Sequence, residues 1–209
     1  MTVTQTDAYL PEFTAYLRME GTETPDASSV TGKIDGTDTT LSVEKVQKMS
    51  ECGQGIRYYI LLDISTSISD EQFRTMKEAV IGLSENLREQ DSMEVITFGQ
   101  KVKTILQGGE SSNVVQEKIN GLTQEKKTHL YEGISYLVSQ AQEDREQEVS
   151  ENRSAELRMR HVGIILTDWQ EIKDVGGSTS KEESLLALQK EGIPLYGYCP
   201  DTVKDTVQD

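Results

Sequence analysis

The chain has few of the residues that staple small proteins or bind transition metals. Its 209 residues include two cysteines and two histidines. Two cysteines are too few to indicate a redox compartment, and no C-x-x-C spacing supports a redox or zinc site. Cys52 precedes one predicted strand and Cys199 ends a later one. A parallel sheet would hold them at opposite ends, so we expect two free thiols rather than a disulfide.

Long apolar runs and an excess of basic residues are also absent. No stretch approaches the about 18 apolar residues of a membrane span, and residues 1–5 lack the basic start and apolar core of a signal peptide. The net charge of −15 argues against nucleic acids and anionic membranes as partners, because phosphate binding needs clustered Lys and Arg. We therefore expect a soluble chain without membrane insertion, which could be part of a longer surface protein.

The first 55 residues differ in composition from the rest of the chain. They are rich in Thr, Asp and Gly, and residues 35–38, Asp-Gly-Thr-Asp, fit a hairpin turn. Three segments have the β-branched and aromatic residues of short strands: residues 13–20, 29–34 and 40–46. We predict a β-rich extension or partial β-sandwich at 1–55, with a linker at 47–56, followed by an α/β domain at 56–209.

From residue 56 onward, strand and helix patterns alternate. This predicts a Rossmann-like, mostly parallel sheet with helices on both faces. The predicted strands are residues 58–62, 93–98, 101–106, 162–166 and 194–198. The predicted helices are residues 69–89, 112–119, 130–142 and 180–190. The short turn at Gly99-Gln100 makes its two flanking strands an antiparallel pair at one edge.

Local signals mark the helix ends. Ser69 with Gln72, and Ser180 with Glu183, have the spacing of capping boxes, and Gly192 follows the last helix. Residues 143–160 are highly charged with almost no apolar face. We predict that they form a solvated helix extension and loop that tolerates substitution.

The central strand ends in oxygen-bearing side chains. Its apolar and aromatic run suits a strand covered on both faces, and open α/β sheets bind ligands at the carboxyl ends of their strands. The next residues include Asp63, Ser65 and Ser67, which offer only oxygen donors. Such ligands, without His or Cys, suit Mg²⁺ or Mn²⁺ better than Zn²⁺. The sequence therefore predicts a hard-cation site here.

A strand followed by D-x-S-x-S resembles the von Willebrand factor type A (VWA) domain family, whose metal-ion-dependent adhesion site (MIDAS) begins with this motif. The family completes the site with a Thr from a downstream loop and an Asp after a later strand. Here Thr128 opens Thr-His-Leu-Tyr-Glu-Gly-Ile, similar to the family's T-x-L-x-x-G-I, and Asp168 ends Ile-Ile-Leu-Thr-Asp. The resemblance covers about residues 56–200, and all five oxygen ligands follow the expected elements.

The resemblance implies a role for each ligand. Ser65 and Ser67 would bind Mg²⁺ directly, Asp63 and Asp168 would act largely through water, and Thr128 would join in either way. Mn²⁺ or Ca²⁺ could replace Mg²⁺. Neutral hydroxyls leave the ion electron-poor, so an open position can take a carboxylate from a protein or peptide partner. The implied function is metal-dependent adhesion or interaction by a monomeric, non-enzymatic domain.

Two residues beside the ligands are candidates for partner binding. The family usually has Gly after the last Asp, but this chain has Trp169. The indole could contact a partner, since Trp is enriched in binding hot spots, or pack under the loop at Gly176-Gly177. His129 follows Thr128 directly, and neither it nor His161 has another metal ligand at a suitable spacing.

Three alternatives stay open. The oxygen side chains could merely cap loops. A magnesium-dependent phosphatase of haloacid-dehalogenase type also places Asp after its first strand, but its usual second Asp is Ser65 here. An intracellular scaffold pairing a VWA-like domain with an ATPase, as in chelatase-type assemblies, would be cytoplasmic. The β-rich start favours a bacterial surface protein instead.

The chain also looks short for the family, because residues 201–209 could supply only the start of a further helix.

Overall fold

The computed structural model describes residues 2–9, 12–21, 24–33, 36–151, 153, 158–169 and 179–198. Their main feature is a five-stranded sheet with strand order β7-β6-β5-β8-β9. The strands are β5 (Ile56–Asp63), β6 (Ser92–Phe98), β7 (Val102–Leu106), β8 (Arg160–Leu166) and β9 (Leu195–Tyr198). β7 pairs antiparallel with β6, and the other neighbours are parallel. This confirms the predicted mixed α/β sheet with one antiparallel edge.

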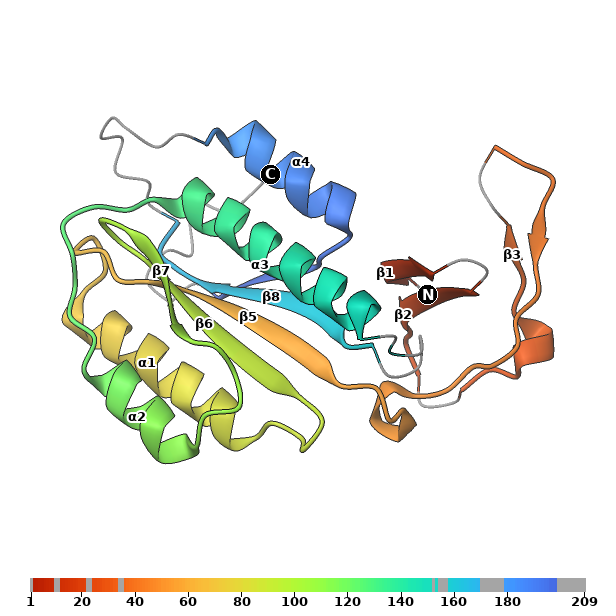
Figure 1. Cartoon of the computed structure of the whole chain (residues 1–209), viewed down its shortest axis with the longest axis horizontal. Helices are drawn as coiled ribbons and strands as arrows, with labels where there is room; N and C mark the ends of the chain where they lie inside the picture. Colours follow the sequence, from red (N-terminus) through yellow and green to blue (C-terminus); the bar gives the residue numbers. More distant parts are fainter. Residues whose placement is uncertain are drawn as a thin grey trace.

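Helices cover both faces of the sheet. Figure 1 shows α1 (Asp70–Glu85) and α2 (Ser112–Asn120) on one face, and α3 (Leu130–Ser150) and α4 (Lys181–Glu191) on the other. Because side chains alternate along a strand, Ile60 and Leu62 of β5 pack in the cluster with α1 and α2, while Tyr59 and Leu61 pack in the cluster with α3 and α4. Burial on both faces explains the unbroken apolar run of β5.

The predicted helix caps are present. Both capping boxes have their reciprocal bonds, at Ser69 with Gln72 and at Ser180 with Glu183. Gly192 ends α4 in the left-handed conformation, with φ of 62°. α1 ends earlier than predicted, at Glu85, and residues 86–91 form a turn in place of its last helical turn. The Asp91 carboxylate accepts bonds from the backbone N–H groups of Arg88 and Ile56, which fixes this turn before β6.

The N-terminal segment forms two hairpins. β1 (Thr2–Tyr9) pairs antiparallel with β2 (Glu12–Arg18), and the short β3 (Gly32–Lys33) pairs with β4 (Thr40–Leu41). Its described helices are the single 3₁₀ turns η1 (Ala27–Ser29) and η2 (Met49–Glu51). The second hairpin was predicted, although its strands are much shorter than expected and Asp35 lies outside the described residues. β1 was missed, because its alternation is mostly Thr with polar residues and its Val3 is exposed.

The β1–β2 hairpin packs at the amino end of the parallel strands. The Tyr16 hydroxyl donates to Gln54 Oε1 over 2.9 Å, and Arg160 Nε at the start of β8 donates to Gln5 Oε1 over 2.8 Å. The Arg160 guanidinium also lies 4.6 Å from the centre of the Tyr16 ring. These contacts place the hairpin at the base of the sheet, to the right in Figure 1.

The helix extension predicted within residues 143–160 is present, but the prediction that it is solvated is wrong. α3 continues to Ser150, and Asp144 accepts from the Tyr59 hydroxyl and pairs with Arg57, each over 2.6 Å. Glu148 is buried and accepts bonds from the backbone N–H of Met159 over 3.2 and 3.3 Å. The charged residues of this stretch therefore include one inward-facing row, spaced one helical turn apart.

The expectations about the cysteines and about membrane-spanning segments can be compared with the structure. Cys52 is a free thiol, and Cys199 lies outside the described residues. No helix in the described part of the chain is long and apolar enough to cross a membrane.

Candidate metal site

The turn after β5 gathers three of the predicted ligands. Asp63 ends the strand and is fully buried. The backbone N–H of Ser65 donates to Asp63 Oδ1 over 2.8 Å, which closes a local turn. The hydroxyl oxygens of Ser65 and Ser67 lie 2.8 Å apart. The turn thus presents one carboxylate and two adjacent hydroxyls at the carboxyl end of the central strand.

The chain after β8 brings the second carboxylate to the same end. The Thr167 hydroxyl donates to Asp63 Oδ2 over 2.7 Å, and Asp168 is 3% exposed. Burial raises the pKa of the Asp63 carboxyl; hydrogen bonds from Thr167 and Ser65 oppose this rise, while the nearby Asp168 carboxylate adds to it. Two mutually repelling carboxylates in a buried setting are stabilised when a cation lies between or beside them.

Thr128 lies on a loop that is hydrogen-bonded to the turn after β5. Glu125 forms a parallel bridge with Ser65, and its backbone N–H donates to the Ile64 carbonyl over 2.6 Å. Gln124 Nε2 donates to the Ser65 carbonyl over 2.9 Å. Three residues after Glu125, the Thr128 hydroxyl is buried and has no hydrogen-bond partner among the described residues. Buried hydroxyls are normally paired, so this oxygen has the environment expected of a metal ligand.

These residues fit a hard divalent cation. The structure brings Asp63, Ser65, Ser67 and Asp168 together and places Thr128 on the adjoining loop, as Figure 1 shows for the strand ends and the start of α3. Within the described ranges, no three His, Cys, Asp or Glu side chains form a possible metal cluster. A cation at this end of the sheet would therefore depend on hydroxyl oxygens as well as carboxylates, which suits Mg²⁺ better than soft metals.

Trp169 lies beside this site in an unusual conformation. Its φ of 59° falls in the left-handed region that glycine adopts without steric cost. A Cβ added to Gly197 of β9 would lie 2.6 Å from Trp169 Cζ2, so the indole rests against the backbone of that strand. The side chain is still 40% exposed. The loop at Gly176-Gly177 lies outside the described residues, and a role in partner contact stays a prediction.

His129 is partly covered. It is the N-cap of α3, and its Nδ1 lies 3.4 Å from Glu132 Oε2 in the first turn of the helix. Its partner-binding role stays a prediction. The sequence did not reveal the supporting contacts of Thr167, Gln124 and Glu125. Thr167 carried a usable signal, because it directly precedes Asp168 at a strand end, whereas nothing local marked the two loop residues.

Comparison with known proteins agrees with this geometry. The family model described as von Willebrand factor type A domain matches residues 59–206. The uncharacterized protein sll0103 of Synechocystis sp. is 29% identical over 93 residues, which are 44% of this chain and 22% of that protein.

Solved structures share the fold at low sequence identity. Proximal thread matrix protein 1 from the mussel byssus, in a form with a zinc-occupied MIDAS motif, aligns with a TM-score of 0.52 and 18% identity, over 70% of this chain and 38% of that one. The conserved hypothetical protein BatB from Bacteroides thetaiotaomicron aligns with a TM-score of 0.50 and 18% identity, over 68% and 65%.

The chain spans less than two thirds of the length of each of these three proteins. The family model, by contrast, covers well over half of this chain, from within β5 to beyond β9. With the D-x-S-x-S turn and the carboxyl-end site in place, the chain belongs to the von Willebrand factor type A domain family.

Proposed function

We propose that this domain binds a protein or peptide partner through a divalent cation held by Asp63, Ser65, Ser67, Thr128 and Asp168. The observation that carries the proposal is the buried Thr128 hydroxyl, which has no hydrogen-bond partner in the described part of the chain and lies next to a turn that already orients the other oxygens. Preorganised ligands favour binding because little conformational freedom remains to be lost.

The proposed ligands have different roles in binding the cation. Asp63 is held on both oxygens, by the Ser65 backbone N–H and by the Thr167 hydroxyl, so its orientation is fixed before any ion arrives. Ser65 and Ser67 supply neutral oxygens that add no negative charge. The ion, when bound, supplies an electron-poor position for a partner carboxylate. Mg²⁺ is the expected ion, with Mn²⁺ or Ca²⁺ as substitutes. The zinc-occupied motif of the mussel protein supports a divalent cation in this position.

We infer no enzymatic activity for the chain. A phosphatase of the type considered above would need an acid two residues after Asp63, and that position holds Ser65, whose hydroxyl bonds to Ser67. We further propose that the domain works at the cell surface as part of a larger protein; the β-rich segment at 1–55 favours this over a cytoplasmic scaffold. Genes adjacent to this one test the point, since an ATPase neighbour would favour the scaffold.

Calorimetric titration with Mg²⁺, Mn²⁺ and Ca²⁺ tests the metal site. Ser67→Ala removes a hydroxyl ligand and little volume, so it should abolish binding while leaving the fold intact. Ser139→Ala on α3 changes an exposed serine away from the site and should bind as wild type. Trp169 is the only tryptophan in the sequence, so a change in its fluorescence emission provides a second measurement of cation binding.

Thermal unfolding gives an independent check. A bound ion should stabilise the wild type by RT ln(1 + [Mg²⁺]/Kd), about 2.7 kcal/mol at a hundredfold excess over Kd, and should not stabilise Ser67→Ala. If the wild type binds none of the three ions at about 10 mM, beyond the roughly millimolar range of weak extracellular cation sites, metal-dependent binding is the wrong function.

A further inference from the structure

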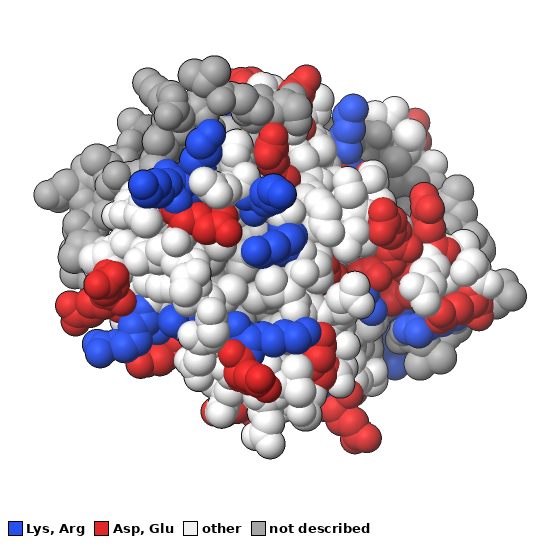
Figure 2. Space-filling view, turned by 60° about the vertical axis from the view of Figure 1, so that its left-hand side comes forward, with Lys and Arg blue, Asp and Glu red and all other residues white. Residues whose placement is uncertain are grey.

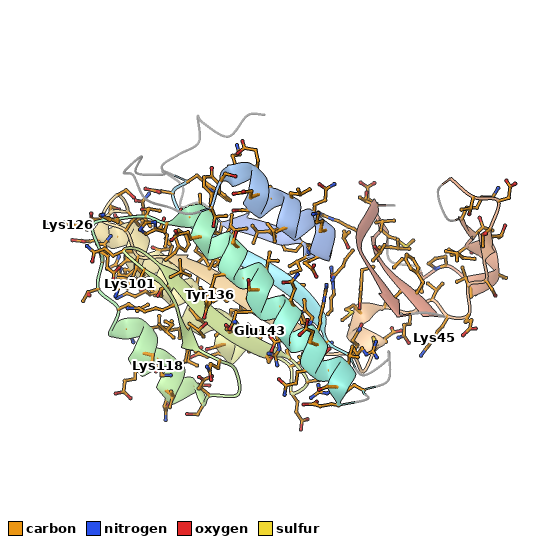
Figure 3. The ribbon with its side chains drawn as sticks, turned by 45° about the horizontal axis from the view of Figure 1, so that its top comes forward. Lys45, Lys101, Lys118, Lys126, Tyr136 and Glu143 are labelled. Atoms are coloured by element: carbon orange, nitrogen blue, oxygen red, sulfur yellow. The ribbon has the colours of Figure 1, made fainter. Side chains whose placement is uncertain are left out.

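The candidate metal site is bordered by lysines, although the chain carries a net charge of −15. Lys101 follows the turn between β6 and β7, and Lys126 and Lys127 directly precede Thr128. All three side chains are exposed. Figure 3 shows Lys101 and Lys126 at the same end of the sheet, with Lys45 at the opposite end of the molecule. We call Lys101, Lys126 and Lys127 the lysine rim.

Hydrogen bonds hold the loops of the rim against the metal site. The Gln100 N–H donates to Glu125 Oε2 over 2.6 Å, which ties the loop of Lys101 to the loop of the other two lysines. Glu125 in turn bonds to the turn after β5, through its N–H to Ile64 and its carbonyl to Thr66. The two lysine-bearing loops are therefore held against each other and against the D-x-S-x-S turn.

The lysines of the rim are available for a partner. The acidic residue among them, Glu125, accepts from the Gln100 backbone and lies 3.9 Å from Lys103 Nζ. Lys101, Lys126 and Lys127 make no ion pair with any residue in the described part of the chain. Figure 2 brings this end of the molecule forward and shows several Lys and Arg side chains on it, with Asp and Glu side chains among them.

Charge of the opposite sign lies beside the site at the start of α1. Asp70 and Glu71 are exposed in the first turn of α1, directly after the D-x-S-x-S turn. The candidate site therefore has a negative border at α1 and a positive border at the lysine rim. A partner segment with acidic residues on one side of its metal-bound carboxylate would fit this arrangement.

We propose that the lysine rim selects an acidic protein segment, one of whose carboxylates binds the cation while the neighbouring ones face Lys101, Lys126 and Lys127. This inference rests on the proposed function, because the cation anchors the segment. An acidic protein repels acidic partners over most of its surface, and the rim reverses that repulsion at the site. Complementary charge of this kind raises the association rate and the specificity of a complex.

Labelled synthetic peptides of equal length test the rim. One probe carries a single Asp among Gly and Ser, and the second adds Asp and Glu on one side of it. Fluorescence anisotropy in excess Mg²⁺ should show tighter binding of the acidic probe to wild type. Each exposed ion pair contributes little by itself, so the three lysines together should give roughly a tenfold preference. The preference should shrink as salt rises from about 0.05 to 0.5 M.

The test variant replaces the rim by Lys101→Gln, Lys126→Gln and Lys127→Gln together. It should lose the preference for the acidic probe, and it should bind Mg²⁺ at least as tightly as wild type, because positive charge near a cation site is removed. Lys45→Gln is the matched control, since Lys45 is an exposed lysine far from the site, and it should keep the preference.

The outcomes separate the two proposals. Failure of Mg²⁺ to bind in calorimetry, without peptide, removes the proposed function and the rim with it. Mg²⁺ binding with single-Asp peptide binding, but equal affinity for both probes, overturns the rim alone. The rim proposal also fails if EDTA leaves acidic-probe binding intact. Rim-dependent binding to phosphatidylserine vesicles that persists in EDTA would assign the lysines to a membrane instead.

Discussion

Trp169 occupies a backbone conformation that most residues avoid. A left-handed φ of 59° costs a residue with a Cβ roughly 1–2 kcal/mol, and glycine does not bear that cost. The indole compensates in part by packing against the backbone of β9 at Gly197. Trp169 and Gly197 are thus a matched pair, in which a large side chain fits because the residue opposite has none.

This pairing predicts a non-additive result. Gly197→Ala should destabilise the wild type by about 1–3 kcal/mol, because the new Cβ would overlap the indole. In a Trp169→Gly background, the same change should shift stability by less than about 0.5 kcal/mol. Denaturant unfolding of the four proteins gives the coupling energy.

A control separates the clash from a general effect of glycine replacement. Gly82 lies in α1 with nothing within 4 Å of its would-be Cβ, so Gly82→Ala should stabilise the protein by about 0.5–1 kcal/mol. If Gly197→Ala costs the same with and without Trp169, the indole does not rest on β9.

The second half of α3 makes tertiary contacts that its sequence pattern does not indicate. The first half of the helix has an apolar face, whereas its second half is mostly polar or charged. The helix continues because Asp144 and Glu148 meet partners that are distant along the chain or lie beyond the helix end, in Arg57 and the Met159 backbone. Hydrophobic periodicity cannot detect such polar pairs.

Glu148 should therefore matter more than its neighbours. Glu148→Ala leaves the Met159 N–H without its acceptor and should destabilise the domain by about 1–3 kcal/mol. Glu146→Ala, an exposed change on the same helix, should stay within about 0.5 kcal/mol. Thermal or urea unfolding distinguishes them, and equal stability of the two variants would restore the solvated interpretation.

The pH dependence of a Gln variant adds a check. Burial raises the pKa of Glu148, partly offset by the Met159 N–H and nearby arginines. Glu148 therefore stays protonated to a higher pH in the folded state than in the unfolded state. The free energy of unfolding of the wild type decreases as pH rises through the raised pKa of Glu148. Glu148→Gln keeps an acceptor and cannot ionise. Its stability relative to wild type should rise as pH increases above the range in which an ordinary glutamate ionises.

The sequence predicted those parts whose signals are local. The strands of the α/β sheet, both capping boxes, and the Asp63, Ser65 and Ser67 turn each follow from adjacent residues. β1 escaped prediction because a hairpin buried mainly at Tyr16 and Gln5 needs little apolar periodicity. The contacts that hold the Thr128 loop in place also escaped, since they join segments about 60 residues apart.

The two ends of the sheet carry different features. The carboxyl ends of the strands carry the candidate metal site and the lysine rim. The amino ends carry the β1–β2 hairpin, docked through Arg160 to Gln5 and Tyr16. The sheet lies between them (Figure 1). We expect that docking of the β1–β2 hairpin does not influence the site.

Arg160→Ala tests that division. It removes a charged hydrogen bond and a cation–π contact, worth about 1.5–3 and 0.5–2 kcal/mol respectively, so the hairpin should open more often. Hydrogen exchange should quicken in β1 and β2 while protection in β5 and β6 persists, because local opening need not involve the core. Mg²⁺ affinity should be unchanged.

Arg74→Ala is the control for loss of an arginine as such. Its side chain is 68% exposed and lies 3.8 Å from Glu78 on α1, a surface pair worth at most about 0.5 kcal/mol. Loss of protection throughout the sheet in Arg160→Ala would show that hairpin and α/β domain unfold as one unit. Weaker Mg²⁺ binding would show that the hairpin acts on the site across the sheet. Faster hydrogen exchange confined to β1 and β2 would show that the hairpin opens separately from the α/β domain. If the two unfolded together, exchange would also become faster in β5 and β9, the strands that pair with β8.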